Sequence, residues 1–152
     1  CRAGEALALS VDHKPSLESE INRIKAAGGF ITDQGRVNGN LNLTRSIGDL
    51  RYKLDETLPP KAQIITAEPD IFRYDLDRAK DEFVIVACDG IWDCLSNQEA
   101  VDFVRCRIAA GVALDTIVEQ MFDQIIASDP KETQGIGGDN MTCIIVRFKK
   151  AI

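Results

Sequence analysis

The sequence predicts an α+β fold built around antiparallel sheet, and two observations support this. First, short apolar segments rich in β-branched residues flank two consecutive amphipathic helical segments. Second, strands and helices do not alternate regularly along the chain. That order favours antiparallel over parallel pairing. The 152 residues, 45% of them apolar, suit one domain with its own core or a large piece of one.

The first half of the chain is expected to contain short elements joined by turns. Ala6 to Ser10 is expected to form a strand after a turn at Ala3-Gly4. A helix is expected to begin at Ser16 and to end at Gly28-Gly29, because apolar residues recur on one helical face between them. The further expected elements are a hairpin around Asp33-Gln34-Gly35, helical turns from Leu43 to Ile47, a surface loop from Arg51 to Lys61, and strands at Ile64-Ile65 and from Ile71 to Tyr74.

The second half of the chain carries the stronger patterns. Phe83 to Ala87 is an unbroken apolar run and predicts a buried strand. Ser96 and Glu99 form a capping box, which predicts the start of a helix. Leu114 to Ile125 has the spacing of a second amphipathic helix, and Met141 to Phe148 is expected to be a closing strand.

Charge and cysteine content restrict the class of protein. The formal net charge of -6 disfavours binding to nucleic acid or to anionic membranes. The five cysteines include no C-x-x-C pair, and their odd number indicates a reducing compartment. No apolar run approaches the roughly 18 residues of a membrane span. We therefore expect a cytoplasmic or nuclear protein without nucleic-acid or membrane partners.

Two acidic segments stand at predicted strand ends. Asp89 and Asp93 follow the apolar run 83–87 with Gly90 between them, and Asp139 precedes the closing strand. Carboxylate oxygens are the ligands that Mg²⁺ and Mn²⁺ prefer, and glycine lets the backbone approach an ion closely. The same spacing also fits turn and cap roles for these aspartates, so on the residues alone both interpretations stay open.

The chain resembles the metal-dependent, or type 2C, serine/threonine protein phosphatases in a series of motifs that run from end to end. Each motif is weak alone, but their common order is specific. The motifs are Asp12-His13-Lys14-Pro15, the Ala26-Gly28-Gly29 helix end, Arg36-Val37-Asn38-Gly39, Leu43-Thr44-Arg45-Ser46-Ile47-Gly48-Asp49, Glu68-Pro69, Asp89-Gly90-Ile91-Trp92-Asp93 and Gly138-Asp139-Asn140-Met141-Thr142.

This resemblance implies a four-layer α/β/β/α sandwich of antiparallel sheets. Residues 1–152 would be the C-terminal part of the catalytic domain, with residues 16–50 forming a flap beside the site. It also implies hydrolysis of phosphoserine and phosphothreonine in proteins by a water that bridges two Mg²⁺ or Mn²⁺ ions. By motif, Asp89 and Asp139 would be metal ligands, and Asp93 would contribute to a third, weaker metal site.

The resemblance suggests roles for five further residues. Arg36 and Lys14 would meet the phosphorylated substrate from the flap, although pairing of Arg36 with a local acid is an alternative. Asn140 would orient the loop beside a metal ligand. Arg45 and Asp49 would have a structural role, as an ion pair at the base of the flap.

Several features of the family do not occur in this sequence. The Asp-Gly-His-Gly-Gly motif, an upstream acidic ligand and the phosphate-binding arginine are absent, so we expect them on an N-terminal half of the same domain. The chain alone is then expected to be inactive. Two alternatives remain, an inactive binding or regulatory module and a haloacid-dehalogenase-type phosphatase. Asp75-Leu76-Asp77 mimics the nucleophile motif of the latter, without its parallel β-α-β order.

Overall fold

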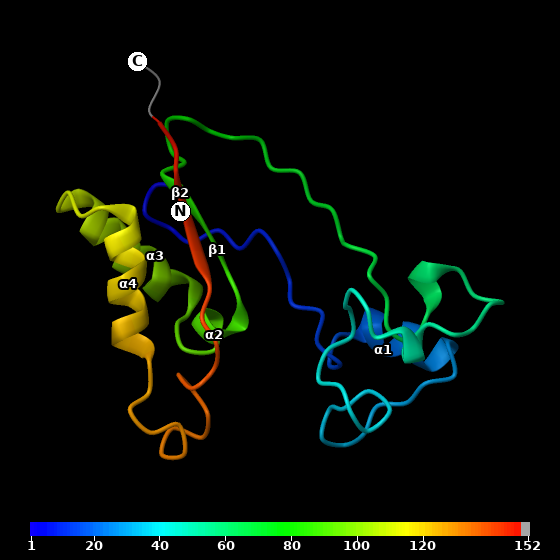
Figure 1. Ribbon diagram of the computed structural model, residues 1–152. Coiled ribbons are helices and arrows are strands. Elements are labelled where there is room, and N and C mark those ends of the chain that lie inside the picture. Colours follow the sequence, from blue (N-terminus) through cyan, green and yellow to red (C-terminus); the bar gives the residue numbers. More distant parts are fainter. Residues whose placement is uncertain (150–152) are drawn as a thin grey trace. The chain divides into compact units, whose positions relative to one another are not determined.

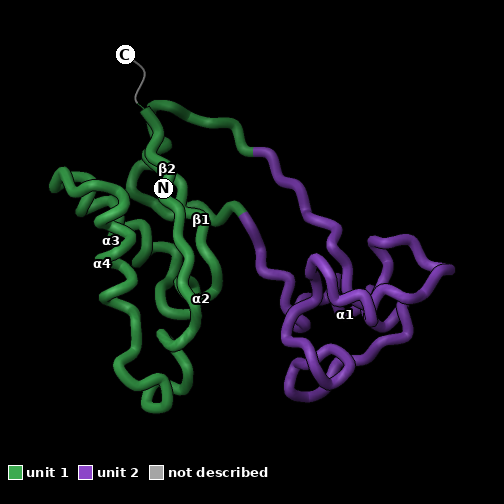
Figure 2. The backbone as a smooth tube through the Cα atoms, in the orientation of Figure 1, with its two compact units in different colours: residues 1–9, 74–152 green, residues 10–73 purple. Residues whose placement is uncertain are grey.

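The computed structural model describes residues 1–149 and divides the chain into two compact units (Figure 2). Unit 1 comprises residues 1–9 and 74–152, and unit 2 comprises residues 10–73. The segment predicted to form a flap, residues 16–50, lies wholly within unit 2. Among the described residues, every helix is too short or too polar to span a lipid bilayer.

Unit 1 consists of an antiparallel strand pair with helices packed on one side (Figure 1). This confirms the predicted α+β class and the antiparallel pairing of its strands. The elements in chain order are β1 (Phe83–Ala87), α2 (Asp89–Trp92), α3 (Asn97–Ala109), α4 (Leu114–Ile125) and β2 (Cys143–Arg147).

The two faces of the strand pair differ in their surroundings. Phe83 and Ile85 of β1, with Ile145 of β2, face the helices and join the buried cluster of Ile117 and Met121. The opposite face is also apolar but exposed, because side chains alternate between the two faces of a strand. On that face Val86, Ile144 and Val146 are 56%, 56% and 46% exposed.

The helix α3 begins as its capping box predicts. The backbone N–H of Glu99 donates to Ser96 Oγ, and the backbone N–H of Ser96 donates to the Glu99 carboxylate over 2.8 Å. Gly111 ends the helix with a φ of +78°, a conformation that glycine adopts without strain. Both ends of α3 are therefore fixed by local chemistry that is readable in the sequence.

Unit 2 contains little regular structure. It holds α1 (Glu18–Ala26) and two 3₁₀ turns, η1 (Leu50–Tyr52) and η2 (Pro60–Ala62), around a small core. The strands expected at Ile64-Ile65 and from Ile71 to Tyr74 do not form. A strand needs a partner along its length, and here the described residues offer isolated bridges instead. These bridges join Ile31 to Val37, Val37 to Leu41, and Arg45 to Thr66. Likewise, 6–10 is not a strand and 43–47 is not helical.

A buried carboxylate organises unit 2. Glu20 is 1% exposed and accepts hydrogen bonds from Arg23 Nη1 at 2.6 Å, Thr44 Oγ1 at 2.6 Å and Arg45 Nη2 at 2.7 Å. Burial raises the pKa of Glu20, but the bonds from Arg45, Thr44 and Arg23 outweigh it and bring the pKa to about 2. One side chain thus ties α1 to the segment around residues 44–45.

The expected ion pair between Arg45 and Asp49 is replaced by other contacts. Besides Glu20, Arg45 contacts Asp70, whose Oδ1 lies 2.8 Å from Arg45 Nη1. Asp49 instead accepts a hydrogen bond from Ser46 Oγ over 2.8 Å. A buried carboxylate without a cation is costly, whereas a partly exposed one can be satisfied by a nearby hydroxyl. The Arg45 guanidinium therefore pairs with Glu20 and not with Asp49.

We expect Glu20→Gln to lower the free energy of unfolding by about 3 kcal/mol, because it leaves Arg23 and Arg45 without their buried counter-charge. Chemical denaturation, with hydrogen exchange to assign the loss to residues 10–73, measures this. Glu18→Gln is the matched control, since Glu18 is exposed in the same first turn of α1. The control should cost less than about 1 kcal/mol.

The pKa of Glu20 also predicts a pH dependence. Its folded pKa of about 2 lies below the ordinary value of 4.5, so the carboxylate stabilises the fold fully above pH 4.5. This contribution is lost as the pH falls from 4.5 to about 2. Glu20→Gln should show a shallower decline in stability over this range. An unchanged decline in the variant would contradict the assignment.

Candidate metal site

The register of β1 and β2 brings the two acidic segments to one end of the sheet. Ala87 pairs with Cys143, so the chain leaves β1 toward Asp89 beside the point where it enters β2 from Asp139. The pairing continues one step further, because the backbone N–H of Cys88 donates to the carbonyl of Thr142 over 3.1 Å. The segments 88–93 and 139–142 therefore run side by side.

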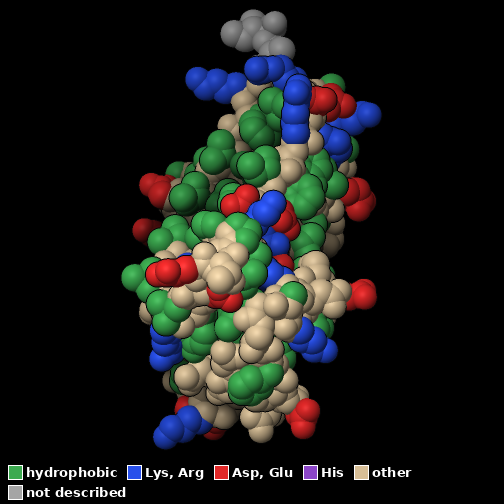
Figure 3. Space-filling model, turned by 90° about the vertical axis from the view of Figure 1, so that its right-hand side faces the viewer, with side chains coloured by type: hydrophobic (Ala, Val, Ile, Leu, Met, Phe, Trp, Pro, Cys, Tyr) green, Lys and Arg blue, Asp and Glu red, His purple; other side chains and the backbone are tan. Residues whose placement is uncertain are grey.

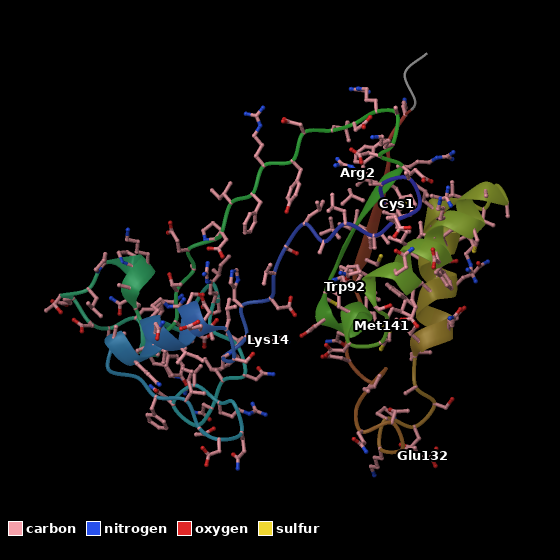
Figure 4. The ribbon with its side chains drawn as sticks, turned by 180° about the vertical axis from the view of Figure 1, so that it is seen from behind. Cys1, Arg2, Lys14, Trp92, Glu132 and Met141 are labelled. Atoms are coloured by element: carbon pink, nitrogen blue, oxygen red, sulfur yellow. The ribbon has the colours of Figure 1, made fainter. Side chains whose placement is uncertain are left out.

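Gly90 allows these segments to approach closely. A Cβ atom at this position would lie 2.3 Å from the carbonyl oxygen of Asn140 and 3.4 Å from Met141 Cγ. The first of these distances is impossible for a real Cβ, so glycine is required at the current spacing. Figure 4 shows Trp92 and Met141 at the same end of unit 1, beside α2.

The thiol of Cys88 forms a second link between the two segments. Its Sγ donates to the carbonyl of Asn140 over 3.3 Å and accepts from the backbone N–H of Thr142 over 3.2 Å. Burial, reinforced by the neighbouring Cys88, raises the pKa of the Cys143 thiol. Both residues thus act here as structural thiols, and all five cysteines are free.

The short helix α2 fixes the position of Asp89. The indole Nε1 of Trp92 donates to the carbonyl of Ala87 over 2.9 Å, which folds the helix back onto the end of β1. The backbone N–H of Asp93 donates to the carbonyl of Asp89 over 2.8 Å. Asp89 and Asp93 therefore lie one helical turn apart, and both are exposed.

The glycine-containing loop before β2 positions Asp139. Gly137 has a φ of +76°, and a Cβ there would lie 2.3 Å from the carbonyl oxygen of Ile125. Its own carbonyl accepts from the backbone N–H of Ala127 over 2.9 Å, which anchors the loop to the end of α4. The Asp139 carboxylate then accepts from the backbone N–H of Asn140 over 2.7 Å.

The three aspartates offer hard oxygen donors but an incomplete ligand set. Asp89, Asp93 and Asp139 are exposed and form no ion pair among residues 1–149. Their donor type matches Mg²⁺ or Mn²⁺. Within the same described residues, no three or more His, Cys, Asp or Glu side chains are grouped so that they could hold a metal ion.

The remaining residues from the sequence analysis lie mostly in unit 2. Lys14 Nζ is 4.0 Å from Asp12 Oδ2, and Arg36 Nη1 donates to the carbonyl of Asn40 over 3.0 Å rather than to an acid. Arg45 and Asp49 have the partners described above, and Asn140 alone of this group lies in unit 1.

Sequence reasoning missed two features, one in each unit. It did not anticipate the links that Cys88 makes, although its position directly after an apolar strand was a signal. It also missed Glu20 of unit 2, a carboxylate at an inward position of an amphipathic helix. A carboxylate at such a position indicates a cationic partner, because an unpaired buried charge is costly.

Comparison with known proteins gives consistent matches. A family model described as "Protein phosphatase 2C" matches residues 1–133. "Protein phosphatase 2C homolog 2" of Schizosaccharomyces pombe is 55% identical over 147 residues, which cover 97% of this chain and 39% of that protein. "Probable protein phosphatase 2C 11" of Oryza sativa subsp. japonica is 50% identical over 151 residues, which cover 99% of this chain and 41% of that protein. The chain therefore spans about two fifths of the length of these relatives.

Solved structures agree on the fold. A phosphatase from a pathogenic strain of Toxoplasma gondii superposes with a TM-score of 0.81 at 27% identity, over 97% of this chain and 44% of that one. Serine-threonine phosphatase 2C from Toxoplasma gondii gives a TM-score of 0.66 at 23% identity, over 93% of this chain and 46% of that one.

We expect Gly90→Ala to push the segments 88–93 and 139–142 apart, because the new Cβ meets the carbonyl oxygen of Asn140. The cost should be about 1–3 kcal/mol of unfolding free energy, as for other overpacked sites. Faster hydrogen exchange of the Cys88 amide measures the local effect. Gly111→Ala is the control, since a Cβ there meets nothing within 4 Å and adds only the strain of a φ of +78°. Unchanged exchange at Cys88 in Gly90→Ala would refute the close approach.

Proposed function

This chain belongs to the protein phosphatase 2C family, and from this premise we propose that it supplies carboxylate ligands to a metal centre that hydrolyses phosphoserine and phosphothreonine in proteins. The ligands are Asp89 and Asp139. Phosphoproteins are the proposed substrates, in keeping with the relatives described as protein phosphatases.

One observation carries the proposal, namely the register of β1 and β2. Because Ala87 pairs with Cys143, the segments that contain Asp89 and Asp139 emerge together at one end of the sheet. The approach of Gly90 to the Asn140 carbonyl tightens this arrangement. Convergence of two acidic segments from adjacent strands is what a shared cation requires.

The chemistry of the donors fits Mg²⁺ or Mn²⁺. When bound, two such ions would supply Lewis-acid chemistry, by polarising phosphoryl oxygens and by lowering the pKa of water. The chain itself would hold and orient the ligands. Asp89 is fixed by its place at the start of α2, and the N–H of Asn140 holds the Asp139 carboxylate. Asn140 thus acts as an orienting residue in this proposal.

Further residues have subordinate roles in the proposal. Asp93, one helical turn beyond Asp89, would contribute to a third, weaker metal site. Lys14, just before the flap segment, and Arg36 within it would attract the phosphorylated part of a substrate. Both side chains are exposed, which suits contact with a phosphate.

In this proposal the chain is one contributor to the site. The described residues lack a group of three or more metal-binding side chains, and the relatives are more than twice as long as their matched segments. We therefore place the remaining ligands, the acid for the leaving oxygen and the phosphate-binding arginine on an N-terminal half of the same domain. The five free thiols suit a reducing compartment, and cytoplasmic or nuclear location is part of the proposal.

The alternatives from the sequence receive different support. The haloacid-dehalogenase hypothesis needs parallel β-α-β order, whereas β1 and β2 are antiparallel. An inactive binding or regulatory module is the second hypothesis for the isolated chain, and the next experiment distinguishes it from the first.

We expect residues 1–152 alone to show no Mn²⁺-dependent hydrolysis of a phosphothreonine peptide, because two carboxylates hold a divalent ion weakly. Replacing the matched segment of the Schizosaccharomyces pombe relative with this chain should give an active chimera. Phosphate release with and without Mn²⁺ measures both. A well-folded but inactive chimera would support the regulatory module, and activity of the isolated chain would overturn the shared site.

In the active chimera, Asp89→Asn and Asp139→Asn should each lower turnover by at least about 100-fold. Mutation of a residue that only hydrogen-bonds to a metal ligand already lowers metal affinity or activity about 10–100-fold, and loss of a ligand itself should cost more. The Mn²⁺ concentration for half-maximal activity should rise in both variants. Asp123→Asn is the matched control, because Asp123 is an exposed aspartate on α4. If either variant keeps wild-type turnover and wild-type Mn²⁺ dependence, the substituted aspartate is not a metal ligand.

A further inference from the structure

Unit 1 contains a second feature of functional interest, at the end of the sheet remote from Asp89 and Asp139. A pocket of about 1240 Å³ lies between the turn at residues 78–82, the second half of α3 and the end of β2. The pair Phe83 and Arg147 closes the strand ladder at this end, as Ala87 and Cys143 close it at the other.

The pocket gathers positive charge on an otherwise acidic chain. Its basic lining residues are Arg78, Lys80, Arg105, Arg147 and Lys149, and its acidic lining residues are Asp81, Glu82 and Asp102. Figure 3 shows Lys and Arg side chains gathered at the top of the face in view, where β2 ends. With a net charge of -6 for the whole sequence, this concentration of cations is local.

Two of the acidic lining residues are already paired. Asp81 Oδ1 lies 2.7 Å from Arg2 Nε, and Glu82 Oε2 lies 2.9 Å from Arg105 Nε. The Arg2 guanidinium brings the pKa of Asp81 to about 2, so this carboxylate stays charged and bound to its partner. Neither acid is free to neutralise the other cations of the pocket.

Several cations of the pocket have no such partner. Across residues 1–149 the structure gives Arg78, Arg147 and Lys149 no ion pair, and all three are exposed. Lys80 is paired with Asp77 over a longer distance, 3.7 Å. The pocket therefore presents uncompensated positive charge to a ligand.

Apolar side chains lie among these cations. Phe83, which is buried, and Ile108 and Phe148, which are partly buried, line the pocket. The volume exceeds the roughly 300–1,000 Å³ of typical small-molecule pockets. A short stretch of polypeptide, with both apolar and acidic side chains, matches this size and this mixture.

We propose that the pocket binds an acidic peptide segment of a partner protein. The carboxylates of the segment pair with Arg78, Arg147 and Lys149, and its apolar side chains contact Ile108 and Phe148. Charge complementarity of this kind sets the choice of partner and the rate of association. Binding here does not require the hydrolysis proposed above, so each proposal can fail without the other.

A nucleic acid is a poorer occupant on the same observations. Its continuous row of phosphates would run past the carboxylates of Asp81, Glu82 and Asp102, which line the same pocket. The acidic remainder of the chain would repel it further. A peptide can place neutral side chains opposite these acids.

Fluorescence anisotropy with residues 1–152 and a short labelled peptide of alternating glutamate and leucine tests the proposal. We expect saturable binding that weakens at high salt, because the contacts are between exposed charges. A peptide with glutamine in place of glutamate should bind at least about fivefold more weakly. Equal binding of the two peptides, no binding of either, or tighter binding of a single-stranded RNA of the same length would overturn the proposal.

Charge-removing variants locate the effect on the chain. Arg78→Gln combined with Arg147→Gln should weaken binding of the glutamate peptide by about fivefold or more. If Arg147→Gln, in β2, impairs folding, Arg78→Gln alone still tests the pocket, because Arg78 lies in an exposed turn. Lys131→Gln is the matched control, since Lys131 is exposed in unit 1 outside the pocket. An equal effect of the control would show that general charge, rather than this pocket, binds the peptide.

Cys106 gives a direct readout of the site. This exposed thiol lines the pocket, whereas Cys94 does not. Saturating glutamate peptide should slow alkylation of Cys106 by N-ethylmaleimide several-fold and leave Cys94 unchanged, as measured by mass spectrometry. If saturating peptide leaves the alkylation rate of Cys106 unchanged, the peptide does not bind in this pocket.

Discussion

The antiparallel pairing of β1 with β2 is the constraint on which unit 1 depends. It sets the register in which Ala87 opposes Cys143, and it buries one face of the pair against α3 and α4. The contact of Gly90 with the Asn140 carbonyl extends this pairing beyond the strands. A slip of one residue would turn every side chain to the other face and would separate the two acidic segments.

The same strand pair gives the two ends of unit 1 different chemistry. One end presents the carboxylates of Asp89 and Asp139, and the other presents the cations of the pocket around Arg78 and Arg147. Unit 2 relies on a different interaction, the buried Glu20 with its two arginines. Unit 2 therefore combines a small apolar core with a buried ion-pair network, whereas apolar packing dominates the core of unit 1.

Local patterns in the sequence predicted the parts of the fold whose cause is local. The strand at Phe83–Ala87 and the helix start at the capping box of Ser96 and Glu99 are examples. The strand is buried on one face only, and not throughout as expected, because burial depends on what packs against each face. The strand expected from Ile71 to Tyr74 failed, since a strand also needs a partner. Asp89 and Asp139 were predicted as metal ligands by motif, and that role stays a prediction. The convergence of the segments that carry them follows from the strand register, which the sequence does not state.

The central claim is that Asp89 and Asp139 hold one metal centre between them. Crystals of the chimera that carries this chain, soaked in Mn²⁺ and measured at the manganese absorption edge, test it most directly. The account predicts anomalous density within about 2.0–2.2 Å of a carboxylate oxygen of each residue, in one shared cavity. Density that either carboxylate fails to contact, or two side chains that point into separate cavities, would contradict the account.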